Sequence, residues 1–279
     1  MKICKTRHEL AAALDEQPGT RALVMTMGAL HHGHAELLKA GREAADVLVA
    51  SVYVNPLQFG PTEDFAAYPR PVESDLALLE REGVDVVFLP SDEEMYPRAP
   101  LVRIDPGPIA TILEGQTRPG HFAGVLQVVH KVFNLVRPDM TFFGQKDAQQ
   151  LALVQTMVDD LNMGIDVRPV PIKRDADGLA LSSRNSYLSD HERQQALAIH
   201  AALRAGNEAA EAGAPAVEVH VTALSAIAEA DGVVLDYLLL VDPDTFEELP
   251  PDATGRGMLV AAAKVGTTRL IDNMEVELR

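Results

Sequence analysis

Two histidines spaced three residues apart offer the clearest chemistry in this sequence. His31 and His34 lie in the segment Thr26–His34, which closes an apolar run and opens an amphipathic stretch. This pattern predicts a strand, a tight turn and a helix start, with both imidazoles on one helix face. Free backbone N–H groups and the helix dipole would favour an anion there, and Gly28 and Gly33 would let it approach the backbone. We therefore expect a nucleotide-phosphate site; the alternative is a histidine pair bonded to nearby carbonyl groups.

Side-chain amides follow the next apolar run, residues 47–54. Asn55 and Gln58 come directly after it, and an amide both donates and accepts hydrogen bonds, which suits a hydroxy acid. Ordinary turn chemistry of an Asn-Pro pair is the alternative for this segment. Asp75 lies in the first turn of the following predicted helix. There it serves as a partner of the helix dipole or, in the sharper interpretation, as a magnesium ligand.

Two later segments carry cationic side chains beside glycine. Residues 142–150 run from a strand into a helix, and Lys146 at that helix start opposes the dipole. Its position favours an anionic ligand, with a solvated lysine as the alternative. Residues 174–185 place two hydroxyl groups beside Arg184, a pattern typical of an oxyanion clamp on a mobile loop. A serine-capped turn with a surface arginine is the alternative there.

Composition limits the partners of the protein. The 279 residues are 47% hydrophobic, which indicates a globular chain with a sizeable core. A formal net charge of −17 argues against nucleic acid and anionic membranes as partners. The single cysteine, Cys4, fits a reducing compartment, and no apolar run is long enough to span a bilayer. We expect a cytoplasmic protein without a signal peptide.

Strand-length apolar runs alternate with amphipathic helical stretches in the first part of the chain. This alternation predicts an α/β fold with a parallel sheet covered on both faces, whose ligands bind beyond the carboxyl ends of the strands. After residue 174 two alanine-rich helices precede three strands, which predicts a smaller α+β domain. The expected domains are 1–174 and 175–279. The expected strands are 22–26, 47–54, 84–89, 140–143, 167–172, 233–241, 257–264 and 268–276, and the expected helices 32–44, 72–82, 123–136, 147–161, 187–212 and 216–230.

Four motifs, in this order, closely resemble those of the pantothenate synthetase (pantoate-beta-alanine ligase) family. They read TMGALHxGH, VNPxQFGPxEDFxxYPR, FFGxKDxQQL and DGLALSSRN, and they fall between residues 26 and 185. The family belongs to the HxGH nucleotidylyltransferase group. The resemblance implies a Rossmann-like N-terminal domain, a smaller C-terminal lid and a homodimer. It also implies a two-step ligation in which ATP and pantoate give pantoyl adenylate, from which β-alanine then displaces AMP.

The resemblance also implies roles for individual residues. His31, His34, Lys146, Ser182, Ser183 and Arg184 would act in catalysis, with His34 as a proton donor. Pantoate and β-alanine would lie near Gln58, Gln150, Asn55 and Tyr68, and Mg2+ would be bound at Asp75. The implied ATP contacts are Met27, Gly28, Ala29, Leu30, His31, His32, Gly33, His34, Gly144, Gln145, Lys146, Asp147, Lys173, Leu181, Ser182, Ser183 and Arg184.

Departures from the family pattern concern the rim of the nucleotide site and the metal. Lys173 stands where an apolar residue commonly contacts the adenine, and neither Ser74 nor Leu78 supplies a carboxylate or amide beside Asp75. The protein would then contribute a single ligand to a Mg2+ held mainly by ATP and water. Two other functions stay open. One is another acid-activating or nucleotidylyltransferase enzyme of the HxGH group, such as one like an aminoacyl-tRNA synthetase, and the other is a catalytically silent nucleotide sensor.

Overall fold

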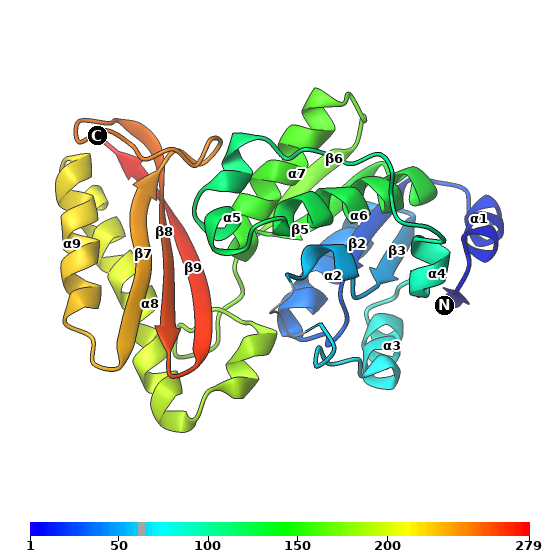
Figure 1. Cartoon of the computed structure of the whole chain (residues 1–279), viewed down its shortest axis with the longest axis horizontal. Coiled ribbons are helices and arrows are strands. Elements are labelled where there is room, and N and C mark those ends of the chain that lie inside the picture. Colours follow the sequence, from blue (N-terminus) through cyan, green and yellow to red (C-terminus); the bar gives the residue numbers. More distant parts are fainter. Residues whose placement is uncertain (61–64) are drawn as a thin grey trace. The chain divides into compact units, whose positions relative to one another are not determined.

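The computed structural model describes residues 1–60 and 65–279. The chain divides into two compact units, each with its own sheet (Figure 1). Unit 1 comprises Met1–Gln145 and Leu153–Pro171, and unit 2 comprises Lys146–Ala152 and Ile172–Arg279. The predicted domain boundary after residue 174 stays a prediction.

Unit 1 is built on a six-stranded parallel sheet in the order β1-β4-β3-β2-β5-β6. The central strands are apolar because helices cover both faces, and every residue of β3 is buried. This confirms the predicted α/β class. The strands are β1 (Lys2–Cys4), β2 (Arg21–Thr26), β3 (Val47–Val52), β4 (Val86–Phe88), β5 (Met140–Gly144) and β6 (Asp166–Val170).

The helices of unit 1 follow the predicted pattern closely. Helix α2 begins at His32 and ends at Ala44, as expected, and packs against β2, β3 and β5. Helix α6 begins two residues before the expected start, at His121, and contacts α1. Helix α7 (Ala148–Asp160) starts in the short segment assigned to unit 2. The other helices are α1 (Arg7–Asp15), α3 (Val72–Arg81), α4 (Asp92–Met95) and α5 (Glu114–Thr117), with 3-10 turns at Pro56–Gln58, Pro108–Thr111 and Gln145–Asp147.

The order of the strands decides where the turns of interest begin. From β2 the chain continues to β3 and β4 on one side, and it returns to β5 and β6 on the other side of β2. Such a switch point is where ligands bind in open parallel sheets. The segment that starts at Met27 follows β2, and the turn at Gln145 follows β5, the neighbouring strand. Sequence periodicity predicts both strands but not that they are neighbours.

Unit 2 carries the smaller antiparallel sheet, in the order β7-β8-β9. Helices α8 and α9 cover one of its faces, α8 against β8 and β9 and α9 against β7 (Figure 1). Buried Leu203, Ala223 and Leu259 form part of the core between these layers. No helix in the described ranges is long and apolar enough to cross a membrane. The elements are α8 (Asp190–Glu211), α9 (Ala216–Ala228), β7 (Val233–Val241), β8 (Gly255–Val265) and β9 (Thr268–Leu278), with a 3-10 turn at Ser183–Tyr187.

Candidate functional site

A buried carboxylate from α3 is hydrogen-bonded to the backbone of the turn between β2 and α2. Asp75 on α3 is 3% exposed and accepts hydrogen bonds from the N–H groups of Ala29, at 2.9 Å, and Leu30, at 2.7 Å. Gly28 and Ala29 both have positive φ, at 83° and 51°. For a residue with a Cβ this conformation is strained by about 1 kcal/mol. Two charge-assisted hydrogen bonds more than offset that strain.

The prediction of a cradle made of free backbone N–H groups was wrong for most of this turn. Besides Ala29 and Leu30, the N–H of Gly28 donates to Thr26 Oγ1 at 3.3 Å, and that of Gly33 to His31 Nδ1 at 3.1 Å. Sequence patterns indicate where a helix starts, but not which side chain reaches its N–H groups from another element. An anion at this turn must therefore be bound mainly by side chains.

The two predicted imidazoles do lie together, although not for the predicted reason. His31 is the N-cap of α2 rather than a helical residue, and its ring centre is 4.1 Å from that of His34. The Nδ1 atom of His34 accepts from the N–H of His31 at 3.2 Å. In both rings Nδ1 is an acceptor, so in the neutral form the proton is on Nε2.

Burial, and secondarily the charge of His31, lowers the pKa of His34 to about 3. The ring is therefore neutral at physiological pH and donates its Nε2–H as a neutral hydrogen-bond donor. A phosphate oxygen is a suitable acceptor for such a donor. His32, also predicted to contact ATP, is exposed.

Gln58 lies in a densely bonded pocket at the 3-10 turn after β3. Its side chain is buried, and its Nε2 donates to Met27 Sδ at 2.9 Å. Its Oε1 accepts from Asn55 Nδ2 at 3.1 Å. Its backbone carbonyl accepts from His121 Nδ1 at 2.8 Å, and Arg118 contacts the other nitrogen of that ring at 3.0 Å. This geometry fixes both ends of Gln58 and links it to the segment that carries the histidines.

Asn55, a predicted substrate contact, has its side-chain amide fully hydrogen-bonded within the protein. The residue is 1% exposed, and Nδ2 also donates to the carbonyl of Gly124 at 3.0 Å. Its Oδ1 accepts from Tyr96 Oη at 3.1 Å and from the N–H of Leu57 at 3.4 Å. These bonds use the whole donor and acceptor capacity of the amide. Asn55 therefore holds Gln58 in place, and any direct bond to a substrate would have to displace one of these partners.

Tyr68 reaches the same turn through aromatic contacts. Its ring lies edge-on to that of Phe59 at 5.8 Å, one residue after Gln58. Part of the second motif, Pro61, Glu63 and Asp64, lies outside the described residues. Gly144 and Gln145 stand at the end of β5, next to β2 in the sheet.

Unit 2 carries the remaining predicted residues. Lys146 is largely buried, with 18% of its side chain exposed, whereas Asp147 beside it is exposed, at 56%. Their charged groups are 3.9 Å apart. Gln150 is half-buried on α7. A lysine side chain that is mostly covered at a helix start agrees with the predicted anion site better than with a solvated lysine.

The serine–arginine segment is a capped 3-10 turn. Ser182 is its N-cap and accepts from the N–H of Arg184 at 3.3 Å, while the Arg184 side chain is exposed. The carbonyl of Lys173, whose side chain is exposed, accepts from the N–H of Leu181 at 2.9 Å. The capped turn has the form of the alternative considered above. The exposed guanidinium and the half-buried hydroxyl of Ser183 nevertheless remain accessible to an anion.

The described residues do not form a metal centre of their own. Within 1–60 and 65–279, no group of three or more His, Cys, Asp or Glu side chains is placed to bind a metal ion. Both oxygens of Asp75 already accept backbone N–H groups. The donor set fits a carboxylate that anchors a turn and does not fit a protein-held Mg2+.

Sequence reasoning missed several residues that organise these segments. His121 was not identified, and neither were Arg174, Asp272 and Asn273, which join the segments of unit 2. One signal was present in the sequence: Asp272 interrupts the apolar alternation of residues 270, 274, 276 and 278 in the last strand. A carboxylate at such a position indicates a buried hydrogen-bond network.

Comparison with known proteins covers almost the whole chain. Residues 2–275 match the family model described as pantoate-beta-alanine ligase. The pantothenate synthetase of Salinispora arenicola is 52% identical over 99% of this chain and 98% of its own length, and that of Acidothermus cellulolyticus is 50% identical over 98% and 90%.

Solved structures agree with the sequence relatives. A pantothenate synthetase from Thermus thermophilus superposes with a TM-score of 0.94, at 44% identity, over 99% of this chain and all of its own. A pantoate-beta-alanine ligase from Francisella tularensis, solved in complex with beta-gamma ATP and beta-alanine, has a TM-score of 0.80 at 33% identity, over 98% and 97% of the two chains.

Proposed function

This chain belongs to the pantoate-beta-alanine ligase family, and on that premise we propose that it condenses pantoate with β-alanine at the expense of ATP. In the first step a pantoate carboxylate oxygen attacks the α-phosphorus of ATP, giving pantoyl adenylate and pyrophosphate. In the second step the β-alanine amine attacks the acyl carbonyl, loses a proton and displaces AMP. The observation that carries the proposal is the imidazole pair on the turn after β2, at the switch point of the sheet.

The proposed chemistry needs positioning and charge neutralisation rather than a covalent nucleophile. His31 and His34 would donate Nε2–H to phosphate oxygens, and the ammonium of Lys146, on a largely covered side chain, would neutralise the charge that develops there. Losing one such donor typically lowers a rate by about 10²- to 10³-fold. On unit 2, Ser182, Ser183 and Arg184 would bind the departing pyrophosphate.

The substrate contacts divide between amide side chains and the nucleotide segments. We assign pantoate to Gln58 and Gln150. β-Alanine would lie near Gln58, with Tyr68 close to both substrates. ATP would contact Met27–His34, Gly144–Asp147 and Lys173, with Asp147 at the ribose. Asn55 and Asp75 act behind these residues, by fixing Gln58 and the histidine turn.

Three further assignments are part of the proposal and follow the family resemblance. Mg2+ would enter bound to the phosphate oxygens and water molecules of ATP, which needs no protein cage. We also propose that the enzyme acts in the cytoplasm and as a homodimer. Its partners are then small molecules, and sedimentation of the purified chain tests the dimer.

Isotope exchange between pyrophosphate and ATP tests the function. The assay is run with Mg2+, with and without pantoate, and without β-alanine. Exchange that requires pantoate supports the acyl-adenylate and its acid, and release of AMP on adding β-alanine completes the reaction. Exchange only with another acid would overturn the substrate, and no exchange with any acid would favour the nucleotide sensor. Lys146→Ala should abolish most of the exchange, whereas Lys39→Ala, which removes a surface ion pair with Glu36, should not.

A further inference from the structure

A carboxylate occupies a core position in the last strand. Residues 270, 272, 274, 276 and 278 of β9 lie on one face, and Leu270, Val276 and Leu278 belong to the apolar core of unit 2. Asp272 shares that face with only 5% of its side chain exposed. A charge at such a position destabilises a fold unless it is paired and fully hydrogen-bonded. Its presence calls for a reason other than the stability of the sheet.

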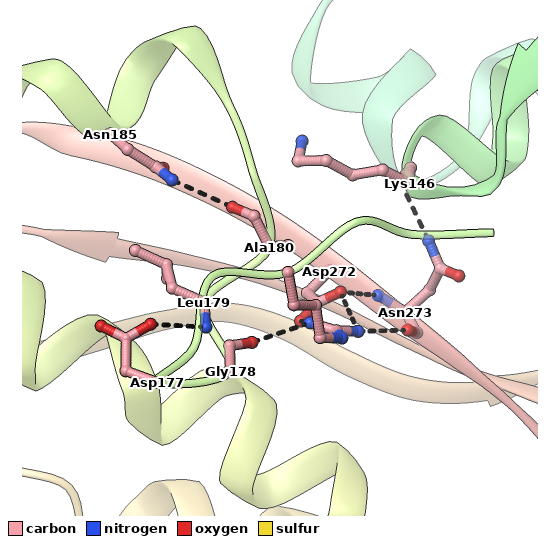
Figure 2. Close-up of polar contacts among 9 residues, drawn as sticks. Lys146, Asp177, Gly178, Leu179, Ala180, Asn185, Asp272 and Asn273 are labelled. Atoms are coloured by element: carbon pink, nitrogen blue, oxygen red, sulfur yellow. Dashed lines mark hydrogen bonds and ion pairs between the residues drawn. The ribbon is translucent and has the colours of Figure 1, made fainter. Parts of the chain in front are cut away.

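Arg174 provides the pairing, and with it a link to the loop that leads to the serine–arginine turn. Its guanidinium donates to both oxygens of Asp272, at 2.6 and 2.9 Å, and also to the carbonyl of Gly178 at 3.3 Å. Residues 174–180 close into a small hairpin through a bridge between Arg174 and Ala180. The Ala180 carbonyl in turn accepts from Asn185 Nδ2 at 3.0 Å, within the 3-10 turn (Figure 2).

Asn273, the next residue of β9, is hydrogen-bonded to the segment of unit 2 that begins at Lys146. Its backbone N–H donates to Asp272 Oδ1 at 2.9 Å, which ties the Asp272 side chain to the backbone of Asn273. Its own amide Nδ2 donates to the carbonyl of Lys146 at 3.0 Å (Figure 2). Because successive residues of a strand point to opposite faces, one dipeptide reaches Arg174 from the core face and Lys146 from the other.

We propose that Asp272 and Asn273 are positioning residues for the adenylating step, and that Asn273 acts by fixing the backbone from which the Lys146 ammonium projects. The inference rests on the proposed function and deepens it, since it assigns the positioning of the Lys146 ammonium to a residue of β9. Asp272 and Arg174 hold the dipeptide and the hairpin in one frame. The hydrogen bond from the Asn273 side chain then limits the range over which Lys146 moves.

The magnitude follows from geometry. A displacement of a catalytic group by about 1 Å lowers a rate by up to about 10²-fold. One lost hydrogen bond that lets the turn shift partway should therefore lower the rate of pantoate-dependent exchange by about 10-fold. The KM for pantoate should change less than the rate, because Asn273 bonds the carbonyl of Lys146 itself, whereas the proposed pantoate contact Gln150 lies one helical turn further along.

A double-mutant cycle with Lys146 tests this directly. Exchange is measured for Asn273→Ala, Lys146→Ala and the double variant, using the full chain. If Asn273 acts through the lysine side chain, its removal lowers the rate by about 10-fold in the native background and by less than about 2-fold once Lys146 is alanine. Asn207→Ala is the control, because it also removes one amide hydrogen bond, to Glu211 on α8, away from this network.

A second variant and a second measurement keep the test decisive. Asn273→Asp retains the shape but replaces the donor facing the Lys146 carbonyl by an acceptor, so its loss should be at least as large as that of alanine. Amide hydrogen exchange of residues 145–150 should become faster in both Asn273 variants and stay unchanged in Asn207→Ala. This readout does not depend on catalysis.

The possible failures are distinguishable. Native protein without pantoate-dependent exchange would refute the proposed function, and the hydrogen-exchange comparison would still decide whether Asn273 fixes the Lys146 turn. Native activity with equal losses for Asn273→Ala in both backgrounds would refute the positioning role alone. Unchanged hydrogen exchange at residues 145–150 would refute it as well.

Discussion

Replacing Asp75 by asparagine separates two roles for this carboxylate, the anchor of the histidine turn and a ligand of Mg2+. The substitution keeps the size of the side chain but removes its charge. The amide oxygen can still accept from the N–H of Leu30, whereas its NH2 group would face the N–H of Ala29. Two donors then point at each other in a site where the side chain is 3% exposed.

The expected loss of stability is about 2–4 kcal/mol. One charge-assisted hydrogen bond of about 1.5–3 kcal/mol is removed, and an unpaired buried N–H costs about 1–3 kcal/mol, partly for the same interaction. For a unit of this size the loss lowers Tm by roughly 5–15 °C. Because the turn carries His31 and His34, the pantoate-dependent exchange should fall as well.

Thermal unfolding and a Mg2+ titration of the exchange reaction provide the assay. The control is Glu73→Gln, which removes an exposed charge from the same first turn of α3 and should leave Tm and activity near native values. If Asp75 anchors the turn, Tm falls and the Mg2+ requirement of the remaining activity is unchanged. An unchanged Tm combined with a Mg2+ requirement raised by about 10-fold or more would contradict the anchoring role of Asp75 and support its role as a Mg2+ ligand.

Three other substitutions test the rest of unit 1. Gln58→Glu places a negative charge beside the pantoate carboxylate and should raise the KM for pantoate; an unchanged KM would remove Gln58 from the pocket. His34→Gln should flatten the acid limb of stability. In the unfolded chain this imidazole binds a proton below about pH 6.5, whereas in the native protein it does so only near pH 3. The free energy of unfolding of the native protein therefore decreases as the pH is lowered from about 6.5 to about 3. Equal slopes of this free energy against pH in the native protein and in His34→Gln would contradict the burial of the ring. Gly124→Ala should lower both Tm and pantoate affinity, because the added Cβ would lie 2.2 Å from the carbonyl oxygen of Leu57, beside Gln58. Native values of both quantities would show that close packing of α6 against this turn does not hold Gln58 in place.

Much of the fold could be predicted because the relevant signals are local. Helix α2 covers the predicted residues 32–44, and strand β7 covers the predicted 233–241, since period and capping depend on neighbouring residues alone. Strand β4 is shorter than the predicted 84–89 because pairing with β1 and β3 decides where a ladder ends. The order of the strands depends on contacts between distant segments, which periodicity does not contain.

The candidate site shows the same division. The types of the proposed reacting groups, the imidazoles of His31 and His34 and the ammonium of Lys146, could be read from the sequence, because their chemistry belongs to the residues. The folded chain, in contrast, sets which partners meet: Asp75 accepts from the N–H groups predicted for phosphate, and Asn273 bonds the carbonyl of Lys146. The bonded residues are far apart in the sequence: Asp75 lies 45 residues from Leu30, and Asn273 lies 127 residues from Lys146. A buried polar group must find a partner wherever the packed chain brings one, and packing, not local sequence, sets which partner that is.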